Sequence, residues 1–295
     1  MKHRKLLIAA ALLLVLAVVL PVLAEGTLSS FVAAGRSLLF ETDNVTLTGH
    51  AEFSYNGERF KTADILYKQD GAYSHWQLDL LTPVPNKPDM ETGYTVVANG
   101  EAIYSMEKYH PGVYSVWYDI PCSSVLRRTL KSDAVMSLAS AAAPVLETLL
   151  PDGAMTVADS ADGREIRISL TKETTPDLLN STLYLAADFF VHRLMATDID
   201  LDWTDYTGTF DRYQTVTEAI LHTTDSIALG DTSLVIRMTA DGRLAGISGE
   251  AVVLLTSSET NDAPLNISFD LSVTDYGSTV VKTFDPAAFG VVQAP

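Results

Sequence analysis

Cysteine is almost absent from this chain of 295 residues, which contains only Cys122. A single thiol excludes an internal disulfide, and it also excludes a zinc site built from cysteines. The chain must therefore be held together by its apolar core alone. Cys122 follows Pro121 and precedes two serines, so we expect it in a loop or at the start of a helix.

Positive charge is scarce as well: 20 lysines and arginines stand against 37 acidic residues, a formal net charge of −17. Three of the basic residues, Lys2, Arg4 and Lys5, belong to the N-terminal leader, so residues 25–295 carry a formal charge of −20. Such a surface repels phosphate backbones, which argues against a nucleic-acid partner. It equally disfavours tight adhesion to anionic lipid headgroups.

The familiar motifs of catalysis are missing. The sequence has no H-E-x-x-H, no G-x-S-x-G, no phosphate loop and no dinucleotide fingerprint. We therefore expect no enzyme activity, no cofactor and no bound metal. A catalytic triad assembled from distant positions stays open, because such triads are defined by geometry rather than by spacing.

The sequence contains two weaker patterns of possible metal ligands. The run Asp198-x-Asp200-x-Asp202 opens like a calcium loop, but Trp203 stands where that loop needs glycine and Thr209 where it needs glutamate. We interpret these carboxylates as the wet face of a strand. A second pattern places His50 and His75 on the polar sides of neighbouring strands, where Glu52 could complete a metal site.

Residues 1–24 have the pattern of a secretory leader. A basic start is followed by an uncharged apolar run from Leu6 to Leu20, then Pro21 and Val22-Leu23-Ala24 before Glu25. We interpret this segment as a cleaved signal peptide. The alternative is an uncleaved N-terminal membrane anchor, since the 19 residues from Leu6 to Ala24 approach the length that spans a bilayer. Either reading exports the rest of the chain.

Alternation of apolar and polar residues predicts strands. Asn44–Tyr55 places Val45, Leu47, Ala51, Phe53 and Tyr55 on one side, and Leu265–Val273 repeats the pattern. Asn56-Gly57, Asp70-Gly71, Asp162-Gly163 and Asp241-Gly242 predict tight hairpin turns between such segments. Strands with one apolar face are typical of antiparallel sheets.

Helical periodicity appears in three places. Thr27–Phe40 predicts a short first helix, a second follows the N-cap candidate Ser132, and a third starts at Thr175-Pro176-Asp177. No linker divides the chain, so we expect residues 25–295 to form a single domain. The predicted fold class is α+β: a strongly curved antiparallel β-sheet, an incomplete barrel, with helices packed on its concave face.

Large apolar side chains concentrate in the first sheet and in the two later helices. Their default role is a packed core. The alternative is a cavity that the sheet and helices leave open for a hydrophobic ligand. The residues that we predict to line such a cavity are Trp76, Leu78, Tyr104, Trp117, Met136, Phe189 and Phe190.

The order of these elements resembles the LolA/LolB lipoprotein-carrier superfamily, which includes the LppX/LprG-type lipid carriers. The resemblance rests on the stretch Asn44–Asp70 with its Tyr67-Lys68-Gln69-Asp70-Gly71 ending. It rests also on Val273-Thr274-Asp275-Tyr276-Gly277, followed by Val280 and Pro286. It implies a curved sheet with helices as an inner lid and a lipid ligand. The chain departs from that family in having no lipid-attachment cysteine and no arginine clearly placed to hold a lid, so no residue role is transferred.

The function that we predict is a non-enzymatic extracytoplasmic protein that binds a lipid or an acylated protein in the concavity of the sheet. It would be secreted, or held on the outer face of the cell membrane by residues 1–24, with no other membrane contact. The alternative is a membrane-anchored interaction or sensor domain with a filled core and no small-molecule ligand.

The fate of the leader gives a first testable prediction. If residues 1–24 are a signal peptide, N-terminal sequencing of the exported protein will begin at Glu25, because cleavage follows Ala24. An exported product that retains Leu6–Ala24 and stays with the membrane fraction would instead establish the anchor.

Overall fold

The structure is a computed structural model that describes residues 27–83, 88–100, 102–108, 113–117, 150–177, 179–181, 226–256, 263–282, 284–285 and 291–293. The helical elements whose bounds fall within these residues are the α-helix α2 (Thr27–Arg36) and the π-helical turn η1 (Ser37–Glu41). The strands are β1 (Asn44–Tyr55), β2 (Glu58–Asp70), β3 (Tyr73–Thr82), β4 (Met90–Asn99), β5 (Ile103–Glu107), β6 (Val113–Trp117), β7 (Met155–Ser160), β8 (Gly163–Leu170), β9 (Ser226–Thr239), β10 (Leu244–Thr256), β11 (Ala263–Thr274) and β12 (Val291–Gln293).

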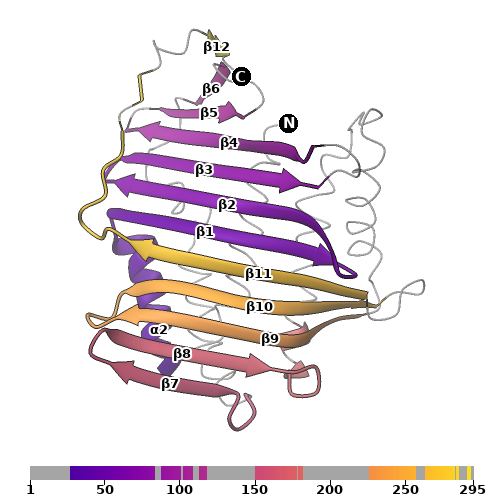
Figure 1. Ribbon diagram of the computed structural model, residues 1–295. Helices are drawn as coiled ribbons and strands as arrows, with labels where there is room; N and C mark the ends of the chain where they lie inside the picture. Colours follow the sequence, from indigo (N-terminus) through magenta and orange to yellow (C-terminus); the bar gives the residue numbers. More distant parts are fainter. Residues whose placement is uncertain are drawn as a thin grey trace.

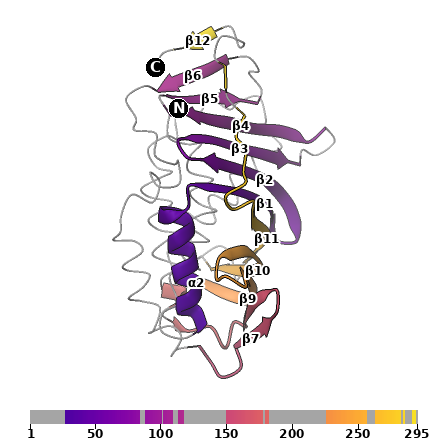
Figure 2. The same cartoon turned by 90° about the vertical axis from the view of Figure 1, so that its left-hand side faces the viewer.

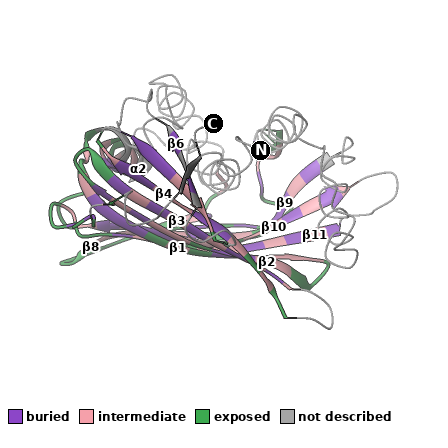
Figure 3. Ribbon diagram, turned by 90° about the horizontal axis from the view of Figure 1, so that it is seen from above, coloured by how far each residue is buried: buried purple, intermediate pink, exposed green. Residues whose placement is uncertain are grey.

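All of these strands belong to one twelve-stranded sheet in the order β12-β6-β5-β4-β3-β2-β1-β11-β10-β9-β8-β7 (Figure 1). Neighbouring strands are antiparallel except for β12, which pairs in parallel with β6. The strands β12 and β7 stand at opposite edges, so the sheet is open. Seen from above, it is curved rather than flat (Figure 3). The prediction of a curved antiparallel sheet that does not close is thereby confirmed.

The strands share one apolar face, as their alternation predicts. Leu47 lies opposite Val273 on one side and opposite Tyr67 on the other, and Tyr67 in turn lies opposite Trp76. Directly paired residues point to the same face of a sheet, so these side chains form a continuous row across β11, β1, β2 and β3. We call this side the apolar face and the other side the opposite face. The buried core cluster on the apolar face extends across the sheet from β4 to β8.

Hairpin turns form where the sequence places them. Asn56 and Gly57 have φ angles of 49° and 79°, the left-handed values that a two-residue turn between β1 and β2 requires. Asparagine and glycine adopt these values at little cost, so they fix the register of the hairpin. The turns between β7 and β8 and between β9 and β10 likewise match predicted positions.

Helix α2 packs on the apolar face, where Phe31, Ala34 and Leu38 join the core cluster (Figure 2). The helix predicted at Thr175-Pro176-Asp177 begins as expected, since Asp177 and residues 179–181 are helical. The helix predicted after Ser132, and the rest of the one after Asp177, lie outside the described residues. Packing of several helices across the concave face is therefore not shown. No helix in the described ranges is long and apolar enough to cross a bilayer.

A second, smaller cluster lies on the opposite face near β4, β5 and β6. Tyr104 pairs with Val97 and Val116 across this part of the sheet, and Val97 pairs with His75. Because Trp76 and not His75 belongs to the apolar face, Tyr104 is on the other side. There its ring contacts Tyr114, with centroids 5.6 Å apart.

The chain after β11 closes over this second cluster. It passes along the edge of the sheet toward β12 (Figure 1), with Thr279 and Val281 buried on the way. Asn44 holds it in place, because its amide donates to the Thr279 carbonyl at 2.9 Å and accepts from the Thr279 amide at 2.7 Å. Phe284 then packs against Tyr104 with 4.6 Å between ring centroids.

Replacing Phe284 tests how strongly this closure stabilises the fold. Phe284→Ala removes the ring contacts with Tyr104 and Tyr114, and we expect the free energy of unfolding to fall by about 2 kcal/mol. Chemical denaturation measures the change. Val280→Ala is the matched control, because Val280 lies in the same segment but is 73% exposed, and it should leave stability unchanged. Equal effects of the two substitutions would contradict a specific role for the aromatic contact.

Candidate functional site

Two of the predicted cavity residues lie together in the core of the apolar face. Trp76 and Leu78 both belong to β3 and are 7% and 0% exposed. Trp76 packs edge-on against Tyr67 with 6.0 Å between ring centroids, and Leu78 lies opposite Tyr94 on β4. These side chains are covered rather than open to solvent.

A third predicted cavity residue, Tyr104, is not brought to them. Tyr104 lies on the opposite face, in the separate cluster that Phe284 covers, so a ligand that contacts Trp76 does not contact Tyr104. The backbone of Trp117 pairs with Ile103 in β5, and its side chain lies outside the described part of the structure. Met136, Phe189 and Phe190 also lie outside the described residues.

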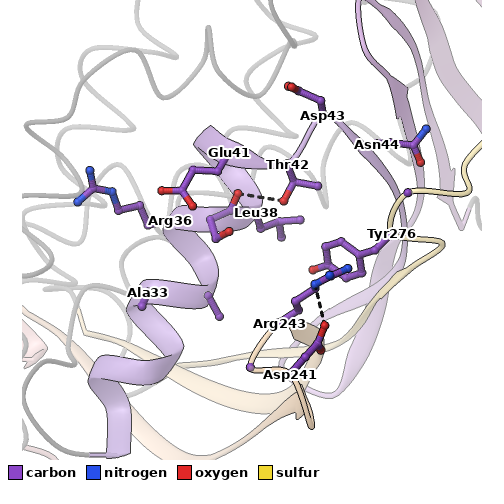
Figure 4. Close-up of a pocket in the computed structure, with 14 residues that line it drawn as sticks. Ala33, Arg36, Leu38, Glu41, Thr42, Asp43, Asn44, Asp241, Arg243 and Tyr276 are labelled. Atoms are coloured by element: carbon purple, nitrogen blue, oxygen red, sulfur yellow. Dashed lines mark hydrogen bonds and ion pairs between the residues drawn. The ribbon is translucent and has the colours of Figure 1, made fainter.

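The structure has instead a cleft of about 830 Å³ at the ends of inner strands of the sheet, beside the end of α2 (Figure 4). Its walls come from α2 and η1, the first residue of β1, the turn between β9 and β10, and Tyr276-Gly277. Sequence reasoning missed this site because its walls are separated by about 200 residues. The turn signal Asp241-Gly242 and the Asp275-Tyr276-Gly277 pattern were visible, but nothing in the sequence placed them beside the first helix.

One wall owes its shape to the π-helical turn η1. The Thr42 amide donates to the Ser37 carbonyl at 2.9 Å, five residues back, and the Thr42 hydroxyl donates to the same oxygen at 3.0 Å. These two hydrogen bonds end the helix and turn the chain into β1. π-Helical turns are rare and are frequent at functional sites. Arg36 and Glu41 are exposed on this wall and line the cleft.

The opposite wall consists of side chains that are bonded to one another. Arg243 forms an ion pair with Asp241, with 2.9 Å between Nε and Oδ2, and its guanidinium lies 5.2 Å from the centroid of the Tyr276 ring. The Tyr276 hydroxyl donates to the Leu244 carbonyl at 2.8 Å. A hydrogen bond from Thr239 lowers the pKa of Asp241, whereas burial raises the pKa of Tyr276 to about 12. At neutral pH this wall therefore has a carboxylate, a guanidinium and a neutral phenol.

The floor of the cleft is apolar and continuous with the core. Ala34 and Leu38 line the cleft and are also buried members of the main cluster, and Tyr276 packs against that cluster. Both signs of charge occur on the rim, so charge alone selects no ligand. The arrangement offers access to the apolar region between α2 and the sheet.

The predicted histidine pair does not form. His50 is on β1 and His75 on β3, with β2 between them, and His50 Nδ1 lies 2.7 Å from Asp64 Oδ1. Burial lowers the pKa of His75, partly offset by a hydrogen bond with the Gln77 side chain. Within the described residues no group of three or more histidine, cysteine or acidic side chains could hold a metal ion.

Comparison with known proteins gives a weak likeness to a solved structure. No protein-family model matches this chain, and no curated protein sequence matches it. Among solved structures, the crystal structure of LolA superfamily protein NE2245 from Nitrosomonas europaea is similar over 90% of this chain and 99% of that chain. The sequence identity is 9% and the TM-score is 0.21, so the link is weak and limited to topology. It transfers neither a ligand nor a residue role to this chain.

Lys61 is a cation on the apolar face, opposite Phe53, and it gives a testable pH dependence. Burial lowers the pKa of its ammonium group to about 8, whereas an unfolded lysine titrates near 10.4. Between these values the unfolded chain binds more protons than the folded one, so stability should rise with pH across that window. Below it, the full cost of burying the charge is present.

Lys61→Met should therefore raise the free energy of unfolding at pH 7 by about 1–2 kcal/mol, a value reduced for the partial solvent contact of the side chain. The gain should shrink as the pH passes from 8 to 10.5, as followed by urea denaturation at each pH. Lys68→Met is the control, because Lys68 pairs with Thr46 on the opposite face. A wild-type stability that is flat across this window would show that Lys61 is not desolvated.

Proposed function

We propose that this is a non-enzymatic, extracytoplasmic protein that binds a hydrophobic ligand, a lipid or an acylated partner, on the apolar face of its open sheet. The ligand gains access through the cleft beside α2. The observation that carries the proposal is that Ala34 and Leu38 line the cleft and also belong to the buried core.

The dimensions of the cleft support this role. Sites for small hydrophobic ligands have volumes of about 300–1,000 Å³ and combine an apolar lining with a few polar groups. The cleft, at about 830 Å³, lies within this range. Among the described side chains, Phe31 and Ala34 of α2 and Leu38 of η1 pack into the core, so a small shift of this short helical segment would extend the cleft along the core.

Localisation is part of the proposal and rests on the leader pattern of residues 1–24. The formal charge of −20 beyond the leader supports an exported protein that does not bind anionic membrane surfaces. Membrane contact would then come only from an uncleaved leader.

One observation favours the second candidate, a membrane-anchored interaction or sensor domain with a filled core. Trp76 and Leu78, which we predicted to line a cavity, are almost fully buried and do not line the cleft. In this alternative the apolar face is only a core, and the protein acts through its surface.

Lipid extraction and native mass spectrometry of the purified protein separate the two candidates. We expect a co-purified lipid, and we expect the neutral dye N-phenyl-1-naphthylamine to bind the delipidated protein. Ala33 is exposed and lines the cleft, so Ala33→Trp should occlude it without disturbing the core and weaken dye binding about tenfold.

The matched control is Ala158→Trp, which places the same side chain on the exposed edge strand β7, on the face of the sheet opposite to α2. It should leave dye binding unchanged. A wild-type protein that carries no lipid and binds no dye would reject the carrier proposal in favour of the filled-core alternative.

A further inference from the structure

The hydroxyl of Tyr94 on β4 is a buried polar group without a hydrogen-bond partner in the described part of the chain. Tyr94 is 7% exposed and belongs to the core cluster of the apolar face, opposite Leu78. Leaving a buried hydroxyl unpaired costs about 1–3 kcal/mol, so such groups are rare and call for an explanation.

Comparable tyrosines of this protein avoid that cost. Tyr67, on the same face two strands away, donates its hydroxyl hydrogen bond to Gln69 Oε1 at 2.8 Å. Tyr276, at the cleft, donates to the Leu244 carbonyl at 2.8 Å. Phenylalanine would fill the position of Tyr94 without an unpaired hydroxyl, so the fold itself gains nothing from this oxygen.

We propose that the Tyr94 hydroxyl donates a hydrogen bond to the carbonyl oxygen of an acyl ester in the bound ligand. The inference rests on the proposed function and deepens it by naming the chemical class of the ligand. Burial raises the pKa of the Tyr94 phenol, which keeps the proton on the oxygen and preserves its role as a donor at physiological pH.

The surroundings of Tyr94 decide between a neutral and an ionised acceptor. Tyr94 belongs to the apolar core cluster and lies directly opposite Leu78. Burying an ionised carboxylate among apolar side chains costs far more than burying a neutral ester carbonyl. The burial of Tyr94 therefore favours the ester over a free fatty carboxylate.

The position of Tyr94 also sets the reach of the ligand. Asn44, at the cleft, pairs with Asp70 on β2. Asp70 pairs with Tyr73 on β3, and Tyr73 pairs with Asn99 on β4. Tyr94 is then three strand spacings across the sheet and five residues along it, a distance of about 20 Å. A ligand that touches both places is an extended acyl chain.

Three probes that share a sixteen-carbon chain test the proposal on the delipidated protein: methyl palmitate, palmitate and hexadecane, each competing with N-phenyl-1-naphthylamine. We expect wild type to bind methyl palmitate more tightly than the other two. Tyr94→Phe should weaken methyl palmitate about 3- to 10-fold, the equivalent of one hydrogen bond, and leave hexadecane and the dye unchanged. The infrared carbonyl band of the bound ester should shift to lower frequency in wild type but not in Tyr94→Phe.

Tyr67→Phe is the matched control, because it removes a hydroxyl from the same face whose partner is Gln69. It should lower the melting temperature and leave the preference for the ester intact, whereas Tyr94→Phe should not lower the melting temperature of the ligand-free protein. Unchanged ester affinity in Tyr94→Phe, or a wild-type preference for palmitate, would overturn this inference. If wild type still binds the dye in that case, the proposed carrier function stands. Absence of dye and lipid binding in wild type would overturn the carrier and this inference together.

Discussion

Each strand of an open sheet can bury its row of side chains only if every neighbour keeps the same register, because a slip of one residue turns the whole row to the other side. In this protein that requirement extends over many strands: Val273, Leu47, Tyr67 and Trp76 form one such row across four of them. With no disulfide to hold the chain, the burial of this row must fix the sheet. Helix α2, the core cluster and the cleft all take their positions from the apolar face.

The opposite face stabilises the same register by charge. Asp270, His50, Asp64 and Asp79 are aligned across β11, β1, β2 and β3, which places acidic side chains next to one another. Arg237 lies 3.0 Å from Asp270 and Lys108 lies 3.0 Å from Asp79, so each offsets a carboxylate, while His50 Nδ1 lies within hydrogen-bond distance of Asp64, at 2.7 Å. Exposed pairs of this kind are each worth at most about 1 kcal/mol. Their effect is on register more than on total stability, because a slipped strand would bring the carboxylates together without their partners. Two of the few basic side chains of this acidic protein, Arg237 and Lys108, thus lie where acidic side chains are aligned.

Sequence reasoning succeeded where a local signal fixes geometry and failed where distant segments meet. Alternation and the Asn56-Gly57 turn determined β1 and its hairpin, because both act within a few residues. In β5 the same reasoning could not decide which face each side chain takes, because Ile103 and Tyr104 are consecutive and both are buried. Alternation cannot describe a strand that is covered on both faces. The cover over Tyr104 is Phe284, 180 positions away in the chain, so its assignment to the apolar side could not be corrected from the sequence. The cleft was missed for the same reason, since α2 and the turn at Asp241-Gly242 are joined only by the sheet.

The polar groups of the two regions differ in a way that separates their roles. At the cleft, Asp241, Arg243 and Tyr276 are bonded to one another or to the backbone, so they are already satisfied and build a wall. On the apolar face, Lys61 is destabilised by desolvation and the Tyr94 hydroxyl is unpaired, so each lowers the stability of the ligand-free fold. Natural proteins tolerate such local costs chiefly at functional positions. The two residues lie on β2 and β4, on either side of β3, which carries Trp76 and Leu78. Under the proposed function, the ligand would pass through the cleft, whose polar groups are already bonded. It would be recognised on the apolar face, where the polar groups lower stability. This division explains why the cleft and two of the residues predicted to line a cavity, Trp76 and Leu78, lie in different places on the apolar face.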